Sequence, residues 1–287
     1  MKFAVIGGDM RSARLAELLA ADGHICSAYA LDKMFMDGGV THYAEISEAV
    51  LGADCVILPL PVSLKEGFLN APLSTSSHML TGVFSALPKD AVICGGRIDE
   101  HTAHISDRAG ITVVDYFARE ELAVANAAAA AEGAVQLLFE ELPVTLAGTK
   151  CLIIGFGRIG KLLARKLSPL GVDVAVSARR HADFAWIKAC GYRVEDTRLL
   201  DGRLSDFDVI VNTVPARILG EHRLRQIKSD CLCLDLASKP GGIDFTAAAR
   251  LQVKAIWALG LPGEVAPVTS GLAIRDTIYN ILKERKG

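Results

Sequence analysis

The sequence predicts an α/β protein with two doubly wound parallel sheets, and two observations lead to this prediction. Short apolar runs alternate with helix-compatible segments along the chain, and the alternation occurs twice. A long segment with almost no helix breaker separates the two series. With 287 residues, 51% of them hydrophobic, the chain can fill two cores.

The first series, residues 1–143, is expected to form a flavodoxin-like substrate domain. Its strands are predicted at the apolar runs 3–7, 24–30, 54–60, 91–96 and 111–117. Such apolar strands are typical of a parallel sheet that is covered on both faces. The first strand ends in "VIGGDMR", which lacks the third glycine of a dinucleotide motif and is therefore interpreted as a substrate-side loop.

Residues 118–143, "AREELAVANAAAAAEGAVQLLFEELP", predict one long linker helix that Pro143 stops. The alanines are interpreted as helix-forming filler. Gly133 costs about 1 kcal/mol inside a helix. We therefore expect another backbone or a ligand to approach the helix there.

The second series, residues 144–266, predicts a Rossmann dinucleotide-binding domain. A strand at 150–154 leads directly into Gly155-Phe156-Gly157-Arg158-Ile159-Gly160, and an amphipathic helix follows. Gly155 permits the tight turn, Gly157 lets a pyrophosphate approach the backbone, and Gly160 lets the helix pack on the strand. The alternative is a glycine-rich turn that binds no ligand.

The end of the next strand predicts NADP as the cofactor. Where an NAD site has an acidic residue for the ribose 2′-hydroxyl, this chain has Ser177, Ala178, Arg179 and Arg180. A 2′-phosphate carries about −1.5 to −2 charges, which the arginine forks can bind, and Ser177 could donate a further hydrogen bond. The alternative is that both arginines are solvated residues at the start of a helix.

The remaining strands of this domain are predicted at 192–196, 208–215, 231–238 and 255–260. Ligands bind open parallel sheets at the carboxyl ends of the strands. We therefore expect Asn212, Thr213 and Pro215 to line the ribose and nicotinamide side of the cofactor.

Candidate substrate ligands follow other strand ends. The segments "SKPGGIDF" (238–245) and "GLPGEVAPVTSG" (260–271) are read as loops whose backbone N–H groups bind carboxylates, although ordinary turn chemistry is an alternative. Arg11 and Arg97 are expected to bind an acidic substrate from the first domain. The full set of predicted substrate-binding residues is Arg11, Arg97, Ser238, Lys239, Gly241, Gly242 and Thr269.

The last segment, residues 267–287, predicts a helix that packs back on the first domain. It is expected to begin near Pro267, to end near Lys286, and to bury one apolar stripe. The residues of that stripe are Leu272, Ile278, Ile281 and Leu282.

Composition narrows the possible partners. The 31 basic and 33 acidic residues give a net charge of −2 without long charged runs, so we expect neither a nucleic-acid nor a membrane partner. We expect no signal peptide, and we judge that no apolar run reaches the ~20 residues of a membrane span. The seven cysteines form no CxxC pair, which favours reduced thiols in a cytoplasmic protein. His101 and His104 lack a third ligand, and no metal is predicted.

Several segments together resemble the A subunits of dipicolinate synthases. The similarity is carried by "VIGGDMR", "NAAAAAEGAVQLL", "GFGRIG", "SARR", "DLASKPGGIDF" and "GLPGEVAPVTSG". The resemblance implies a fold similar to that of D-2-hydroxyacid dehydrogenases, NADP as cofactor, and oxidation of a dihydrodipicolinate-like intermediate to dipicolinate. It further implies spore formation in the mother-cell cytoplasm, on the lysine and diaminopimelate branch, with a flavoprotein-like B subunit as partner. We also expect a homo-oligomer.

Two other functions are compatible with the sequence. A D-2-hydroxyacid dehydrogenase acting on another small acid would need an arginine and a late histidine, whereas "ASKPGG" offers Lys239 and "LGLPGEVAP" offers no histidine. A non-catalytic NADP-binding regulator would bind the nucleotide without turnover. No acid–base pair stands out in the sequence, so the catalytic proton acceptor is not identified.

Overall fold

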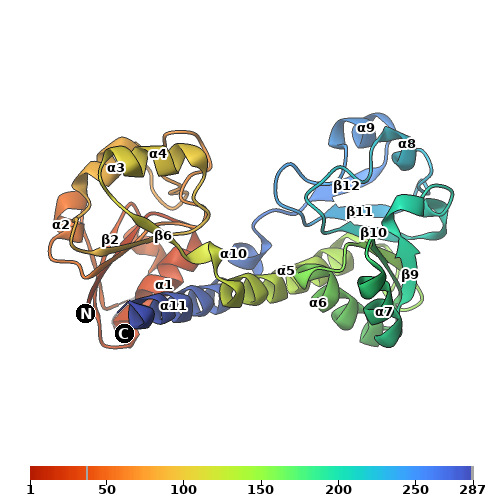
Figure 1. The fold of residues 1–287 in the computed structure, drawn as a ribbon, viewed down its shortest axis with the longest axis horizontal. Helices are drawn as coiled ribbons and strands as arrows, with labels where there is room; N and C mark the ends of the chain where they lie inside the picture. The colour runs from red at the N-terminus through yellow and green to blue at the C-terminus, as the bar shows by residue number, and fades with distance from the viewer. Residues whose placement is uncertain (37, 286–287) are drawn as a thin grey trace. The chain divides into compact units, whose positions relative to one another are not determined.

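The computed structural model describes residues 1–36 and 38–285 of the chain. They form two compact units, one of residues 1–126 with 266–287 and one of residues 127–265. Figure 1 shows a parallel sheet with flanking helices in each unit, which confirms the predicted fold class.

The first unit contains six strands among its described residues, in the order β3-β2-β1-β4-β5-β6. This is the 3-2-1-4-5-6 order of a Rossmann sheet, so the flavodoxin-like assignment, whose order is 2-1-3-4-5, is corrected. The sequence pattern did not predict β3, because this three-residue edge strand, "VTH", has no apolar run. The strands are β1 (Lys2–Ile6), β2 (Ile25–Tyr29), β3 (Val40–His42), β4 (Cys55–Ile57), β5 (Val92–Gly95) and β6 (Val113–Asp115).

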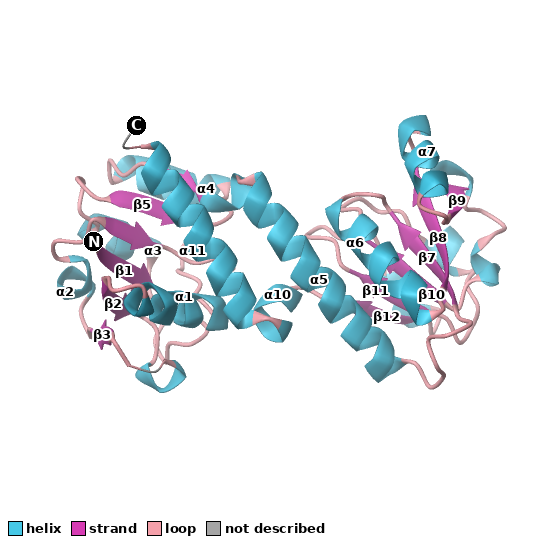
Figure 2. Ribbon diagram, turned by 90° about the horizontal axis from the view of Figure 1, so that it is seen from below, coloured by secondary structure: helices cyan, strands magenta, loops and turns pink. Residues whose placement is uncertain are grey.

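Helices cover both faces of this sheet. They are α1 (Met10–Ala21), α2 (Ile46–Val50), α3 (Leu80–Ala86), α4 (Glu100–Arg108) and α11 (Pro267–Glu284), with short 3-10 turns η1 (Lys33–Phe35) and η2 (Tyr116–Ala118). Helix α11 lies along α1, as Figure 2 shows. A Cβ on Gly271 would lie 3.1 Å from the Leu15 nitrogen, so the missing side chain permits this close packing.

The buried stripe of α11 differs in one position from the prediction. Ile278, Ile281 and Leu282 are buried as expected, whereas Leu272 is only half-buried and Ile274 is buried instead. Ile274 precedes Ile278 by one helical repeat of four residues, which places it on the α1 side. The expected end at Lys286 lies outside the described residues.

The second unit contains a sheet of the order β12-β11-β10-β7-β8-β9, which is again the Rossmann order. Alternate residues of its central strand enter different cores, Cys151 and Ile153 on one face and Leu152 and Ile154 on the other. The strands are β7 (Lys150–Ile154), β8 (Asp173–Ala178), β9 (Arg193–Asp196), β10 (Val209–Asn212), β11 (Leu232–Asp235) and β12 (Lys254–Trp257). The helices and 3-10 turns are α6 (Arg158–Leu167), η3 (Ser168–Leu170), α7 (His181–Ala189), η4 (Thr197–Leu199), η5 (Leu204–Asp206), α8 (Glu221–Leu224), α9 (Phe245–Arg250) and α10 (Leu261–Val265).

The long helix α5 (Glu120–Glu141) connects the two units, as predicted from its alanine-rich sequence. By length and composition it could span a membrane, contrary to the expectation that no run approaches a span. However, 44% of its most apolar 18-residue stretch is buried inside the protein, and a core helix can have the same length and composition. The Leu261 side chain approaches the helix at Gly133, because a Cβ added to this glycine would lie 3.1 Å from the Cβ of Leu261.

Residues 260–271 are mainly helical, so the expectation of a loop there is wrong. They form α10 and the start of α11, and Gly263 and Ser270 donate their N–H groups to the carbonyl oxygens of Gly260 and Ala266 within these turns. Pro267 occupies the first turn of α11, where a missing N–H costs nothing. The start of α11 at Pro267 confirms the predicted start of the last helix.

Candidate functional site

The turn between β7 and α6 has the geometry of a dinucleotide-binding loop. Gly155 has φ +101° and donates its N–H to the Ser177 carbonyl oxygen at 2.9 Å. A Cβ on Gly160 would lie 2.0 Å from the Gly155 carbonyl oxygen. Only glycine at both positions lets α6 begin this close to the end of β7.

The N-terminus of α6 is open to a ligand. Gly157 is the N-cap residue, no side chain caps the helix, and a Cβ built on Gly157 meets nothing within 4 Å. No side chain therefore caps the N–H groups of the first turn, which can bind a phosphate. The residues present therefore fit the pyrophosphate of a nicotinamide dinucleotide.

The other residues of this motif have different surroundings. The Phe156 side chain is buried in the core, and the partly buried Ile159 side chain packs against that core. Arg158, the first residue of α6, is exposed.

The end of β8 carries an unpaired positive charge. Arg179 is exposed and forms no ion pair with any described residue, whereas Arg180 donates two hydrogen bonds to Asp183 at 2.8 and 2.9 Å. The hydrogen bond from Arg180 lowers the pKa of the Asp183 carboxyl. Arg179 is therefore the better placed of the two for a 2′-phosphate.

Ser177 and Ala178 point away from solvent. Ser177 is 0% exposed, and the Thr197 hydroxyl lies 3.0 Å from its oxygen. The hydrogen bond from Ser177 to a phosphate, expected from the sequence, is thus not available, because this end of β8 is buried and the Ser177 hydroxyl lies against Thr197 inside the protein. Ala178 is buried as well.

Asn212 and Asp235 form a buried polar pair at the ends of β10 and β11. The Asn212 amide donates to Asp235 Oδ1 at 2.7 Å, and both side chains are 0% exposed. Asp235 Oδ2 also accepts the N–H groups of Gly242 at 2.6 Å and Ile243 at 3.1 Å. Sequence reasoning missed Asp235, although an acidic residue ending the apolar run "CLCLD" was a visible signal.

This pair changes the interpretation of the loop after β11. Because Asp235 occupies the Gly242 N–H and the Ser238 carbonyl oxygen accepts the Gly241 N–H at 2.9 Å, these two glycines do not offer free donors to a substrate. Ser238 and Lys239 are exposed, so their side chains stay available. The sequence-based interpretation failed here because the chain's own carboxylate fills the backbone anion site, and no sequence spacing reveals that contact.

The loop after β10 lies beside the glycine turn. Thr213 donates its hydroxyl to the Ile154 carbonyl oxygen at 2.9 Å, and a Cβ on Gly155 would meet this hydroxyl at 2.6 Å. Pro215 is exposed. The structure thus brings Thr213 together with the dinucleotide loop of the same unit.

In the first unit, Arg11 is held by the protein itself. Its guanidinium donates to Asp9 from Nε at 3.0 Å and Nη2 at 2.7 Å, and Nη2 also donates to the Leu60 carbonyl oxygen at 2.5 Å. Only 7% of the residue is exposed. These contacts favour a structural role in joining the ends of β1 and β4.

Arg97 has the opposite environment. It follows β5 with φ +55°, a strained conformation for a non-glycine residue, and Asp115 accepts the N–H groups of Arg97 at 2.9 Å and Ile98 at 3.2 Å. Its exposed guanidinium has no hydrogen bond to a described residue. Thr269, on α11, is also exposed.

Comparison with known proteins places these observations in a family. Residues 2–117 match the N-terminal domain of the A subunit of dipicolinate synthase, and residues 123–237 match the NAD-binding domain of D-isomer specific 2-hydroxyacid dehydrogenases. The dipicolinate synthase A subunit of Bacillus subtilis (strain 168) is 32% identical to this chain, over 99% of the chain and 96% of the relative. The chain belongs to the family of dipicolinate synthase A subunits.

Solved structures agree with this membership. The dipicolinate synthase A subunit of Bacillus halodurans superposes with a TM-score of 0.87 at 29% identity, covering 98% of this chain and 97% of that chain. Its Bacillus subtilis counterpart gives 0.86 at 31%, covering 99% and 96%. D-lactate dehydrogenase of Escherichia coli, at 16% identity and a TM-score of 0.63 over 100% and 98% of the chains, shares the fold. Membership and the dehydrogenase-type domain support an oxidoreductase role that uses a nicotinamide dinucleotide.

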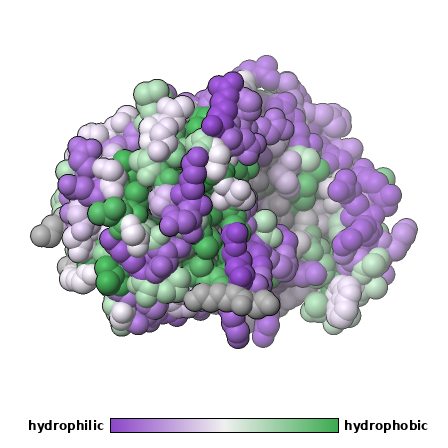
Figure 3. All heavy atoms as spheres, turned by 60° about the vertical axis from the view of Figure 1, so that its left-hand side comes forward, coloured by the Kyte–Doolittle hydropathy of each residue, from purple (hydrophilic) through white to green (hydrophobic). Residues whose placement is uncertain are grey.

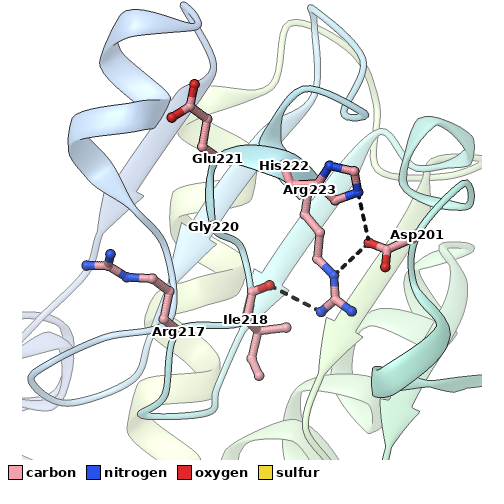
Figure 4. Close-up of a pocket in the computed structure, with 7 residues that line it drawn as sticks. All are labelled: Asp201, Arg217, Ile218, Gly220, Glu221, His222 and Arg223. Carbon is pink, nitrogen blue, oxygen red and sulfur yellow. Dashed lines mark hydrogen bonds and ion pairs between the residues drawn. The ribbon is translucent and has the colours of Figure 1, made fainter.

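A hollow of about 420 Å³ beside α8 contains none of the residues predicted for the dipicolinate synthase-type site (Figure 4). Arg223 donates to Asp201 at 3.0 Å and to the Ile218 carbonyl oxygen at 3.2 Å. The charges there largely neutralise one another, which argues against a strong ligand site. The lining residues are Asp201, Arg217, Ile218, Gly220, Glu221, His222 and Arg223.

Figure 3 shows hydrophobic and hydrophilic residues side by side on one face of the protein. Within residues 1–36 and 38–285, no three His, Cys, Asp or Glu side chains are grouped so that they could hold a metal ion.

Proposed function

We propose that this chain is an NADP-dependent oxidoreductase that oxidises a dihydrodipicolinate-like intermediate to dipicolinate during spore formation. The observation that carries the proposal is the open glycine turn of β7 and α6 beside the unpaired Arg179, in a chain 32% identical to a dipicolinate synthase A subunit. We further propose that it works in the cytoplasm as a homo-oligomer, together with a flavoprotein-like B subunit.

The chain's own residues account for binding and orientation. The first turn of α6 holds the pyrophosphate, Arg179 binds the 2′-phosphate, and Thr213 contacts the nucleotide beside the glycine turn. When bound, oxidised nicotinamide accepts a hydride. Lys239, in the same unit as the glycine turn, is exposed and unpaired among the described residues and binds a substrate carboxylate. Arg97, in the first unit, is also exposed and unpaired among the described residues, and its role in substrate binding is tested separately below.

The proposed reaction requires no covalent bond between the substrate and the protein. Conversion of a dihydropyridine dicarboxylate to the aromatic pyridine removes one hydride and one proton, and aromaticity supplies much of the driving force. The protein therefore contributes mainly by positioning the substrate.

Cofactor preference tests the proposal first. We expect NADP to bind at least tenfold tighter than NAD, a difference of about 1.4 kcal/mol, because only NADP carries the phosphate that Arg179 can bind. Calorimetry with both nucleotides measures this. Arg179→Ala should remove most of the preference, and Arg193→Ala, an exposed arginine paired with Glu195, is the control. Equal dissociation constants for NADP and NAD in the parent would refute the NADP assignment.

Substrate binding is tested at Arg97. A charge-assisted hydrogen bond to a carboxylate contributes about 1.5–3 kcal/mol, so Arg97→Met should weaken dipicolinate binding about tenfold or more and leave NADP affinity unchanged. Dipicolinate titrations of the NADP complex measure the effect. Arg11→Met is the informative comparison, because its contacts predict lower thermal stability instead. Parent-like dipicolinate binding by Arg97→Met would remove Arg97 from the site.

Turnover separates an enzyme from a regulator. The parent chain, assayed with NADP and dihydrodipicolinate with and without the B subunit, should form dipicolinate. Nucleotide binding without product in either assay would favour the non-catalytic alternative.

A further inference from the structure

Tyr29, His78 and Ser74 form a hydrogen-bonded chain in the first unit. Tyr29 Oη lies 2.9 Å from His78 Nδ1, and Ser74 Oγ lies 2.9 Å from His78 Nε2. Tyr29 is the last residue of β2, while the other two lie in the segment before α3. All three residues are half-buried, so these hydrogen bonds link the sheet to the surface.

The hydrogen-bonded chain lies at the carboxyl edge of the first sheet, beside the glycine turn between β1 and α1. Gly7 donates its N–H to the Tyr29 carbonyl oxygen at 2.8 Å, and Leu69 donates its N–H to the His78 carbonyl oxygen at 2.9 Å. The Leu69 side chain covers Gly7, where an added Cβ would lie 2.7 Å from its Cδ2. Open parallel sheets bind ligands at this edge.

His78 is suited to accept a proton. Both ring nitrogens face hydroxyl groups, so one hydroxyl donates to the neutral ring and the ring N–H donates to the other. Burial lowers the pKa of His78 below its usual value, so the ring is neutral at neutral pH and one ring nitrogen is free of a proton.

Other acids and bases at this edge are engaged elsewhere. Asp9 pairs with Arg11, and Asp115 accepts the backbone N–H groups that hold Arg97. The segments packed beside Tyr29, Ser74 and His78 carry further titratable and charged groups, which include Asp32, Glu45, Lys65, Glu66 and His101. Burial raises the pKa of Tyr29, and the nearby charge of Glu45 raises it further. The Glu66 carboxylate lies 3.3 Å from Nδ1 of His101. No acidic side chain of the described residues forms an ion pair with His78, so no counter-ion keeps the ring protonated before the reaction.

We propose that His78 accepts the proton that the substrate loses on oxidation, with the Ser74 hydroxyl relaying that proton and Tyr29 orienting the ring. The proposal rests on the proposed function and supplies the base that the sequence did not reveal. The Ser74 oxygen takes a proton from the dihydropyridine as it passes its own proton to Nε2. The electron pair of the broken bond stays in the ring and completes the aromatic system, and an oxidised nicotinamide dinucleotide held by the glycine turn would accept the hydride.

Kinetics test the relay directly. His78→Gln should lower kcat about 100-fold or more and change the KM for the substrate and the Kd of NADP less than about twofold. Ser74→Ala should also lower kcat, because the ring then lacks its relay. His104→Gln, an exposed histidine on α4, is the matched control and should behave like the parent.

The pH profile distinguishes a base from a merely structural residue. Parent kcat should fall as the pH drops through the lowered pKa of His78, since the protonated ring cannot accept a proton. This acid limb should be absent in His78→Gln. If the variant does not fold, Ser74→Ala provides the same comparison.

Nuclear magnetic resonance gives a readout that does not depend on turnover. The His78 ring signal, assigned by its loss in His78→Gln or its shift in Ser74→Ala, should move when dipicolinate is added, and its pKa should rise beside the bound carboxylates. An unmoved signal would overturn the proposal, as would parent-like kcat with an unchanged acid limb in the folded variants. If the parent itself shows no NADP-dependent turnover, the proposed function fails, and the dipicolinate response alone then decides whether His78 belongs to a ligand site.

Discussion

Asp235→Ala is expected to destabilise the second unit by about 3–5 kcal/mol. The carboxylate is fully buried and accepts hydrogen bonds from the Asn212 amide and from the N–H groups of Ala237, Gly242 and Ile243. Alanine leaves all these donors buried without an acceptor, and each such group costs about 1–3 kcal/mol. The loop of residues 237–243 should then lose its conformation together with the end of β11.

Urea unfolding followed by circular dichroism measures this effect, with the curves fitted to two transitions because the chain has two compact units. Asp230→Ala, an exposed aspartate shortly before β11, is the control and should change stability by less than about 0.5 kcal/mol. Asp235→Asn should lie between the two, since its amide keeps one acceptor oxygen. Equal stability of Asp235→Ala and the parent would contradict a structural role for the buried pair.

Gly160→Ala and Gly157→Ala are expected to separate folding from nucleotide binding. At Gly160 an added Cβ would lie 2.0 Å from the Gly155 carbonyl oxygen, a backbone atom that cannot move without displacing α6 from β7. We expect a loss of about 3 kcal/mol in stability together with loss of NADP binding.

At Gly157, by contrast, a Cβ meets nothing within 4 Å. Gly157→Ala should therefore fold with a cost below about 1 kcal/mol at the N-cap, yet bind NADP at least tenfold more weakly, because the methyl group takes the space of the phosphate. Thermal denaturation and NADP calorimetry on both variants measure the two effects. Unchanged NADP affinity in Gly157→Ala would place the pyrophosphate elsewhere.

Four strands of the second unit, β7, β8, β10 and β11, could be predicted from the sequence because each is a short apolar run that is almost entirely buried. The edge strand β3 could not, since half-buried "VTH" has neither an apolar run nor a turn signal on which a prediction could depend. That strand decides between a flavodoxin-like and a Rossmann order in the first unit.

Parts of the candidate site were also predictable. The glycine spacing from Gly155 to Gly160 and the arginines after β8 are local features, since the turn, the helix start and the residues beyond a strand end follow from a few consecutive positions. Which arginine stays free was not predictable, because Arg180 binds Asp183 one helical turn ahead while Arg179 faces solvent.

The sequence by itself thus determined the fold class, the linker helix and the dinucleotide loop, because apolar periodicity and glycine placement act over short distances. Only the tertiary structure decided which polar groups are occupied. The Asp235 carboxylate accepts the backbone N–H groups of residues 242–243. Arg11 donates hydrogen bonds to both Asp9 and Leu60, and His78 lies within hydrogen-bond distance of Tyr29, 49 residues earlier in the sequence. A buried polar group takes its partner from whatever the fold brings within about 3 Å, and sequence spacing carries no record of that distance.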